Sequence, residues 1–73
     1  MIRECSIIKI VLSPQLMELK LAALINYTGT VVEDLSYGER KNKGFMIQLH
    51  TSFLDEYLWF IPLQSVKEYE PNL

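Results

Sequence analysis

The stretch "EYLWFIPLQSVKEYE", residues 56–70, decides the fold because it joins three kinds of local structure in fifteen residues. Its run from Tyr57 to Ile61 is apolar and rich in aromatic residues, which is typical of a strand. Pro62 ends this strand because proline has no N–H to donate to the ladder. We expect "PLQS" to form one tight turn of 3₁₀ type, and "VKEYE" to form a short last strand.

The preceding chain predicts three further strands, one helix and two polar turns. Ser13 and Pro14 are typical of a helix start, because serine caps free backbone amides and proline fits the first helical position. Asn26 is suited to a left-handed helix end. Counted from the N-terminus, the predicted elements are strand 5–12, helix 14–25 with a core stripe of Met17, Leu21, Leu24 and Ile25, strand 29–35, loop 36–44, strand 45–50 and turn 51–56.

Composition and length predict one ordinary globular domain, residues 1–73, with a loose tail at about residues 71–73. Of the 73 residues, 49% are hydrophobic and 22% charged, so the chain can build a core, and there is room for only one. The single cysteine excludes an intrachain disulfide and a thiol-based zinc site within one chain. Lys9 interrupts the apolar N-terminal run and no cleavage site follows, so we expect a cytoplasmic protein without a membrane span.

Five short strands make too small a sheet to remain open and flat, so we expect them to close into a barrel with one short helix inserted between the first two strands. This mainly β order resembles the SH3-like barrel, in which two more strands, a one-turn helix and a final strand follow a polar loop. The segment "YTGTVVEDL", residues 27–35, resembles the glycine-centred segment of KOW-type SH3-like domains. The resemblance implies that Leu58 and Phe60 point inward, with Trp59 beside a groove or under the inserted helix.

Two departures limit what the resemblance implies about function. KOW domains generally have a short basic loop that reaches RNA where this chain has the predicted helix. Signalling SH3 domains bind polyproline with a tyrosine-rich first segment, which is aliphatic here. The resemblance therefore implies a fold and transfers no functional residue.

The sequence supplies no convergent catalytic or metal-binding motif, so we expect no enzyme, no cofactor and no small-molecule substrate. His50 is the only histidine, and a hydrogen-bonded or solvated histidine at a strand end is a simpler interpretation than a catalytic base. Glu33 and Asp34 are neighbours in a predicted strand, so their carboxylates diverge.

A protein partner or a second copy of the chain is the first function that we expect. The predicted helix is apolar on more than one face, and a barrel covers only one side of it. Outward aromatic residues add to this surface, and Trp59 joins it if it is exposed, because tryptophan is a frequent anchor of recognition. The expected protein-binding residues are Leu16, Leu19, Lys20, Tyr27, Tyr37, Tyr57 and Trp59.

An RNA-contacting, KOW-like accessory domain is the alternative. The loop at residues 38–44 carries Arg40, Lys41 and Lys43 and only one acid, and Tyr37 lies nearby for base stacking. The net charge of −2 for the whole chain disfavours nucleic acid as a partner.

Overall fold

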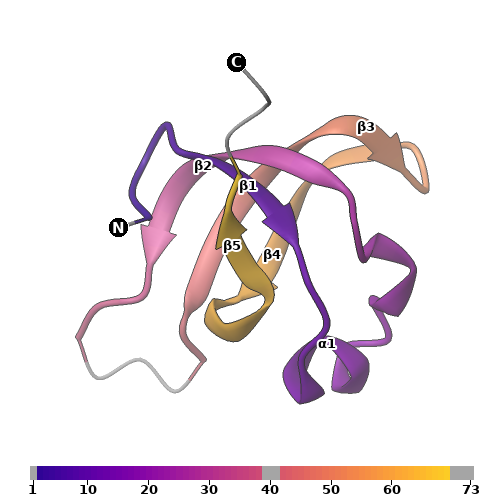
Figure 1. Cartoon of the computed structure of the whole chain (residues 1–73), viewed down its shortest axis with the longest axis horizontal. Coiled ribbons are helices and arrows are strands. Elements are labelled where there is room, and N and C mark those ends of the chain that lie inside the picture. Colours follow the sequence, from indigo (N-terminus) through magenta and orange to yellow (C-terminus); the bar gives the residue numbers. More distant parts are fainter. Residues whose placement is uncertain (1, 39–41, 70–73) are drawn as a thin grey trace.

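The five strands form one antiparallel sheet in the order β4-β3-β2-β1-β5 in the computed structural model, which describes residues 2–38 and 42–69 (Figure 1). The elements are β1 (Ile7–Ile10), α1 (Pro14–Glu18), η1 (Ala22–Leu24), β2 (Thr28–Leu35), β3 (Gly44–Phe53), β4 (Glu56–Pro62), η2 (Leu63–Ser65) and β5 (Val66–Glu68). The predicted mainly β fold with one short α-helix between the first two strands is confirmed. β4 and β5 are the two edges of the sheet, so closure into a barrel is not confirmed. The tail at residues 71–73 lies outside the described residues.

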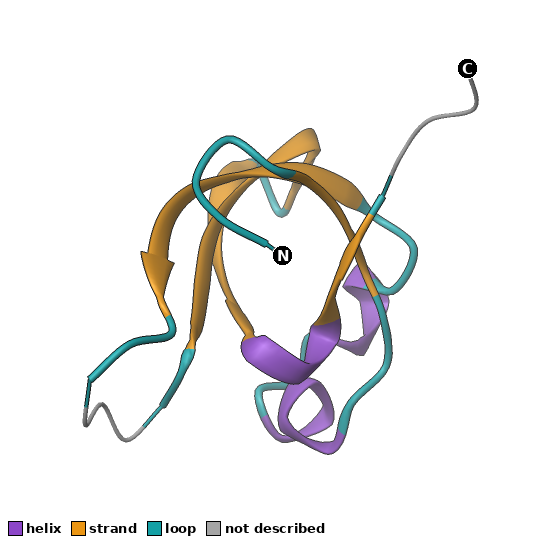
Figure 2. Ribbon diagram, turned by 60° about the vertical axis from the view of Figure 1, so that its left-hand side comes forward, coloured by secondary structure: helices purple, strands orange, loops and turns teal. Residues whose placement is uncertain are grey.

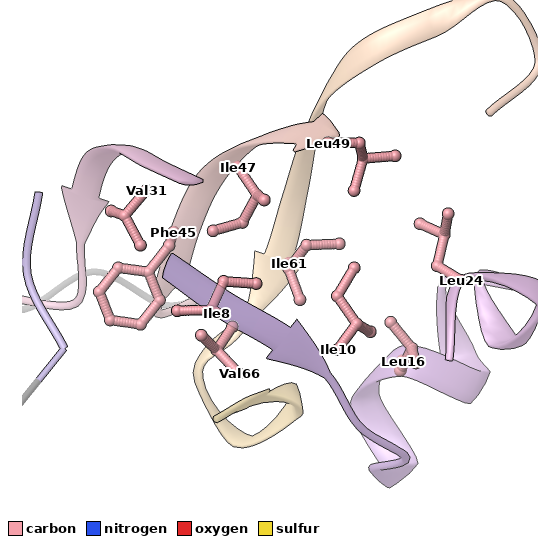
Figure 3. Close-up of a cluster of buried hydrophobic side chains, with 10 residues drawn as sticks. All are labelled: Ile8, Ile10, Leu16, Leu24, Val31, Phe45, Ile47, Leu49, Ile61 and Val66. Carbon is pink, nitrogen blue, oxygen red and sulfur yellow. The ribbon is translucent and has the colours of Figure 1, made fainter. Parts of the chain in front are cut away.

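The sheet is strongly curved, and the helical segments gather at one end of it (Figure 2). Alternate side chains of the strands point to the inside of this curve, where they form one hydrophobic core with two leucines from the helical segments (Figure 3). The buried hydrophobic residues are Ile8, Ile10, Leu16, Leu24, Val31, Phe45, Ile47, Leu49, Ile61 and Val66. Every second side chain is therefore buried in β1, at Ile8 and Ile10, and in β3, at Phe45, Ile47 and Leu49. In the described part of the chain, no helix is long and apolar enough to cross a membrane.

The predicted continuous helix over residues 14–25 is wrong in length. Ser13 caps α1 as expected, since its hydroxyl accepts a hydrogen bond from the Leu16 amide. The helix ends after Glu18 because Lys20 takes a left-handed backbone conformation with φ of 61°. The amide of Lys20 bonds to the Met17 carbonyl and the amide of Leu21 to the Leu16 carbonyl, a Schellman-type ending. Asn26, with φ of 76°, does terminate η1 in the left-handed region.

Early termination of α1 changes which of its side chains are buried. Leu16, which we expected on the exposed side, has 0% of its surface accessible and lies beside Ile10 and Leu24 (Figure 3). Met17, which we expected in the core stripe, is 54% exposed. The reason is that α1 has a single turn, and the cap at Ser13 fixes where this turn begins. Only one side chain of α1, that of Leu16, therefore faces the sheet. Leu12 is also exposed, because β1 ends before it.

The buried face of β4 is the opposite of the one that the resemblance implied. Ile61 is completely buried and Trp59 packs against the core, whereas Leu58 is exposed and Phe60 is half-buried. Pairing with β3 fixes this choice, because Ile61 lies opposite Phe45 and Trp59 lies opposite Ile47. Both of those β3 residues point into the core.

The hairpin between β3 and β4 is tighter than the predicted turn over residues 51–56. Residues 51–53 belong to β3, and only Leu54 and Asp55 form the turn, both with positive φ, of 52° and 63°. Positive φ at both central residues is the pattern of a type I′ hairpin turn. The one-turn segment after Pro62 is confirmed as the 3₁₀ helix η2.

Candidate functional site

A groove of about 430 Å³ lies where α1, the start of β3, the end of β4 and η2 meet. We call it the helix groove. Its apolar surface comes from Leu19 and Leu63, which are 48% and 42% exposed, from half-buried Phe60 and from buried Pro62. The remaining lining residues are polar: Gln15, Glu18, Asn42, Lys43 and Gln64. The volume falls within the range of roughly 300–1,000 Å³ that is common for ligand sites.

Buried serine hydroxyls hold the two sides of the helix groove together. The side chains of Ser13, before α1, and Ser65, in η2, are hydrogen-bonded to each other. The Val11 amide also donates to the Ser65 carbonyl at 2.8 Å. Because Ser13 caps α1 as well, one pair of side chains sets where α1 begins and where η2 lies beside it.

The floor of the helix groove depends on a glycine. A Cβ atom built on Gly44 would lie 2.8 Å from Cζ of Phe60 and 2.3 Å from the carbonyl oxygen of Ile61. Only glycine therefore allows the Phe60 ring and the β4 backbone to lie this close to β3. The Leu63 amide donates to the Lys43 carbonyl at 3.0 Å, which continues the contact between the two strands to the start of η2.

The polar rim of the helix groove carries charges of opposite sign on different elements. Glu18 belongs to α1 and Lys43 immediately precedes β3. The amides of Gln15, Asn42 and Gln64 can each donate and accept hydrogen bonds. This combination suits a ligand that has an apolar side chain together with exposed peptide groups.

The structure separates the residues that we expected to form one protein-binding surface. Leu19 lines the helix groove, and Lys20 follows α1 without lining it. Tyr37 and Tyr57 are exposed, but neither lines the groove. Leu16 is buried and cannot belong to a surface, so that assignment is corrected.

Tyr27 and Trp59 belong to an aromatic cluster instead. Phe53 packs edge to face against both rings, with centroid distances of 6.0 Å to Tyr27 and 5.4 Å to Trp59. The Trp59 indole donates to the Glu56 carbonyl at 3.1 Å. Trp59 is half-buried, packs against the core and does not line the helix groove, so its contacts are those of a structural residue.

The loop predicted as an RNA contact is described only in part. Arg40 and Lys41 lie outside the described residues, and Lys43 lines the helix groove. At the other end of the loop, the side chain and the amide of Ser36 both donate to Asp34. The Ser36 hydroxyl, and then its amide, hold the pKa of Asp34 below its ordinary value of 3.8.

His50 is hydrogen-bonded, as expected. Its Nδ1 lies 3.0 Å from the hydroxyl of Thr28 and its Nε2 lies 3.1 Å from the hydroxyl of Thr30. Both ring nitrogens are thus occupied by threonines, and neither contacts a serine or cysteine that could act as a nucleophile. Among residues 2–38 and 42–69, no group of histidine, cysteine and acidic side chains could hold a metal ion. Cys5 is exposed.

Sequence reasoning missed most of the helix groove because four separate segments build it. Phe60, Pro62, Leu63 and Gln64 lie within residues 56–70, whose pattern predicts a strand and a turn but no surface. The available signal was Leu63, an apolar residue directly after the proline in a one-turn segment. Comparisons with family models, with curated proteins and with solved structures give no match to this chain.

Proposed function

We propose that this chain is a small, non-enzymatic interaction module that binds a short extended segment of a partner protein in the helix groove. The observation that carries the proposal is the exposure of Leu19 and Leu63 in one groove with Phe60 and Pro62. Isolated exposed leucines are common on soluble proteins, but apolar residues gathered in a groove and rimmed by polar ones are typical of recognition sites.

The chemistry of the groove favours an extended peptide over a compact apolar ligand. An apolar side chain of the partner would lie on Phe60 and Pro62, between Leu19 and Leu63. The amides of Gln15 and Gln64 could pair with the partner's peptide N–H and C=O groups, which an extended segment leaves free. Glu18 and Lys43 would favour a basic residue on the α1 side and an acidic residue on the β3 side.

We also propose that the fold is an SH3-like barrel. The order of elements supports this: a long connection between β1 and β2, a polar loop, a hairpin, and the 3₁₀ turn η2 before the last strand. The curvature of the sheet supports it as well (Figure 2). The helical segments would then take the place of barrel closure between the edge strands β4 and β5, since α1 contacts both β4 and η2.

The experiment is selection of linear peptides from a displayed random library on the immobilised full chain, followed by affinity measurement for the selected peptides. We expect peptides with an apolar residue flanked by charged ones. Leu19→Gln and Leu63→Gln should each weaken their binding by roughly fivefold or more, because truncating a central apolar contact costs at least about 1 kcal/mol.

Met17→Gln is the matched control, because Met17 is exposed on the same helix but does not line the groove. Equal losses for the Met17 and Leu19 variants, or a failure to select any peptide, would contradict the proposal. A chain that is dimeric in light scattering and becomes monomeric on Leu19→Gln would show that the occupant is a second copy rather than a peptide.

A further inference from the structure

The outer face of the sheet, on the side opposite the core, carries a group of cationic, polar and aromatic side chains. Neighbouring residues in the ladder form two parallel rows across β5, β1, β2 and β3. One row runs Lys67, Lys9, Thr28 and His50, and the other runs Tyr69, Ile7, Thr30 and Gln48. We call these eight residues the outer face. At about 4.8 Å between neighbouring strands, each row is roughly 14 Å long.

The two lysines of the outer face lie directly opposite each other. Lys9 on β1 pairs with Lys67 on β5. Like charges at such a position destabilise a sheet, and neither row of the outer face contains an acid to compensate them. Neither lysine makes an ion pair with a described residue; the Lys9 ammonium instead lies 5.9 Å from the centre of the Tyr69 ring. This arrangement places two positive charges about one strand apart, neither of them in an ion pair with residues 2–38 or 42–69.

Two aromatic rings flank this pair of lysines. Tyr69 is on the β5 side, held by the hydrogen bond from its amide to the Ile7 carbonyl at 3.0 Å. His50 is on the β3 side, and the hydroxyls of Thr28 and Thr30 fix its ring by one hydrogen bond to each nitrogen. Both side chains are exposed. The His50 ring, held in this way, can stack on a base at little cost in conformational entropy.

We propose that the outer face binds a segment of single-stranded nucleic acid. The phosphates would lie at Lys9 and Lys67, and bases would stack on Tyr69 and His50. A pair of positive charges flanked by aromatic rings on an exposed sheet suits a single strand, because the phosphates and the unpaired bases are recognised separately. An acidic protein segment would use the lysines but would leave the two rings without a role.

This site is independent of the helix groove, since the two surfaces share no residue. It is also separate from the loop at residues 38–44, which was the predicted RNA contact. The outer face has only two cationic side chains, so we expect moderate affinity for a single strand with a shallow salt dependence. Each phosphate contact contributes about 0.7 to the slope of log affinity against log salt for a single strand.

The test is fluorescence anisotropy of a labelled oligothymidylate of about 12 nucleotides, a length within the range that small single-strand binding folds cover. The full chain is titrated at low ionic strength and over a salt series. We expect Lys9→Gln and Lys67→Gln each to weaken binding at least about fivefold and to reduce the slope by about 0.7. We expect Tyr69→Ala to weaken binding about fivefold or more, and Tyr69→Phe to retain it, because stacking needs the ring and not the hydroxyl.

Three control measurements accompany the titration. Lys20→Gln removes the same charge from a position outside the outer face and should change neither affinity nor slope. Lys41→Gln tests the loop, and polyglutamate as competitor tests an acidic polypeptide as the ligand. Circular dichroism and thermal unfolding show whether each variant is folded. If Lys9→Gln does not fold, Lys67→Gln still tests the proposal, because Lys67 lies in the edge strand β5.

The proposal is overturned by any of four results. The first is that the wild-type chain does not bind the oligothymidylate at low salt, and the second is that Lys20→Gln and Lys9→Gln weaken binding equally. The third is that only Lys41→Gln weakens binding. The fourth is that polyglutamate displaces the oligothymidylate while Tyr69→Ala still binds it fully. The last result would identify an acidic protein segment as the ligand. None of the four bears on peptide binding in the helix groove, so the two proposals can fail separately.

Discussion

The hydroxyl groups of Ser13 and Ser65 are hydrogen-bonded to each other in the interior, although 52 residues separate them in the sequence. They are the two buried polar residues of the described structure. The pair joins the N-terminus of α1 to η2, and these two elements form opposite sides of the helix groove. The groove is therefore supported by the fold and does not depend on side-chain contacts at the surface alone.

Ser13→Ala should lower the free energy of unfolding by about 1–3 kcal/mol, because it removes the cap of α1 and leaves the Ser65 hydroxyl buried without its partner. Ser65→Ala should lower the free energy of unfolding by a smaller amount, since the Ser13 hydroxyl keeps its hydrogen bond to the Leu16 amide. In a double-mutant cycle by urea denaturation, the two losses should not add, because both variants remove the same bond. Additive losses would mean that the hydroxyls do not stabilise each other.

Lys20→Gly should stabilise the protein by about 0.5–1 kcal/mol, since Lys20 has φ of 61° and glycine takes this conformation without strain. Lys20→Val should destabilise it, because a β-branched residue is strained in the left-handed region. The measurement is chemical denaturation of both variants. If Lys20→Gly were destabilising, the helix would continue through residue 20 in solution, as the sequence pattern had predicted.

Gly29→Ala should destabilise the protein by more than about 2 kcal/mol, because the added methyl group would overlap a packed backbone that cannot move aside. A Cβ atom there would lie 2.6 Å from Cγ2 of Ile47 and 2.7 Å from the Gln48 carbonyl oxygen. Gly38→Ala is the matched control, since nothing lies within 4 Å of its Cβ position and only its φ of 72° is unfavourable. In thermal unfolding, the melting temperature of Gly29→Ala should be clearly lower than that of Gly38→Ala. Equal melting temperatures would contradict the close packing of β2 on β3.

Ser36→Ala should raise the pKa of Asp34 toward its ordinary value of 3.8, because the Ser36 hydroxyl is the main cause of its lowered pKa. A lowered pKa in the folded state stabilises the protein above the unfolded pKa, and this contribution is lost as the pH falls through the folded pKa. The wild-type chain should therefore lose stability below about pH 4 more steeply than the Ser36→Ala variant. Carbon-detected NMR titration of the Asp34 carboxyl is the direct measurement, and an unchanged pKa in the variant would contradict the assignment.

The features that the sequence predicted correctly depend on local chemistry. Ser13 with Pro14 marks the start of a helix, and Pro62 followed by a polar turn marks the 3₁₀ segment, because cap and proline effects act within a few residues. The sequence of β3 separates its faces locally too, since Gln48 and His50 are polar while Phe45, Ile47 and Leu49 are apolar.

The features that sequence reasoning missed depend on contacts between distant segments. Both faces of β4 are apolar, so only its pairing with Phe45 and Ile47 of β3 decides that Trp59 and Ile61 point inward. The end of α1 was missed because a lysine occupies a position that glycine usually marks. The helix groove could not be seen in the sequence because its lining residues converge from four parts of the chain.

The central claim, that the helix groove binds an extended protein segment, is tested most directly by NMR chemical-shift mapping with a selected peptide. The largest amide shifts on titration should fall on Leu19, Lys43, Phe60, Leu63 and Gln64. Leu19→Gln should need several-fold more peptide to produce the shifts of the other four residues, while Met17→Gln leaves the titration unchanged. Shifts that instead cluster at Tyr37 and Tyr57, with the groove residues unmoved, would contradict the claim.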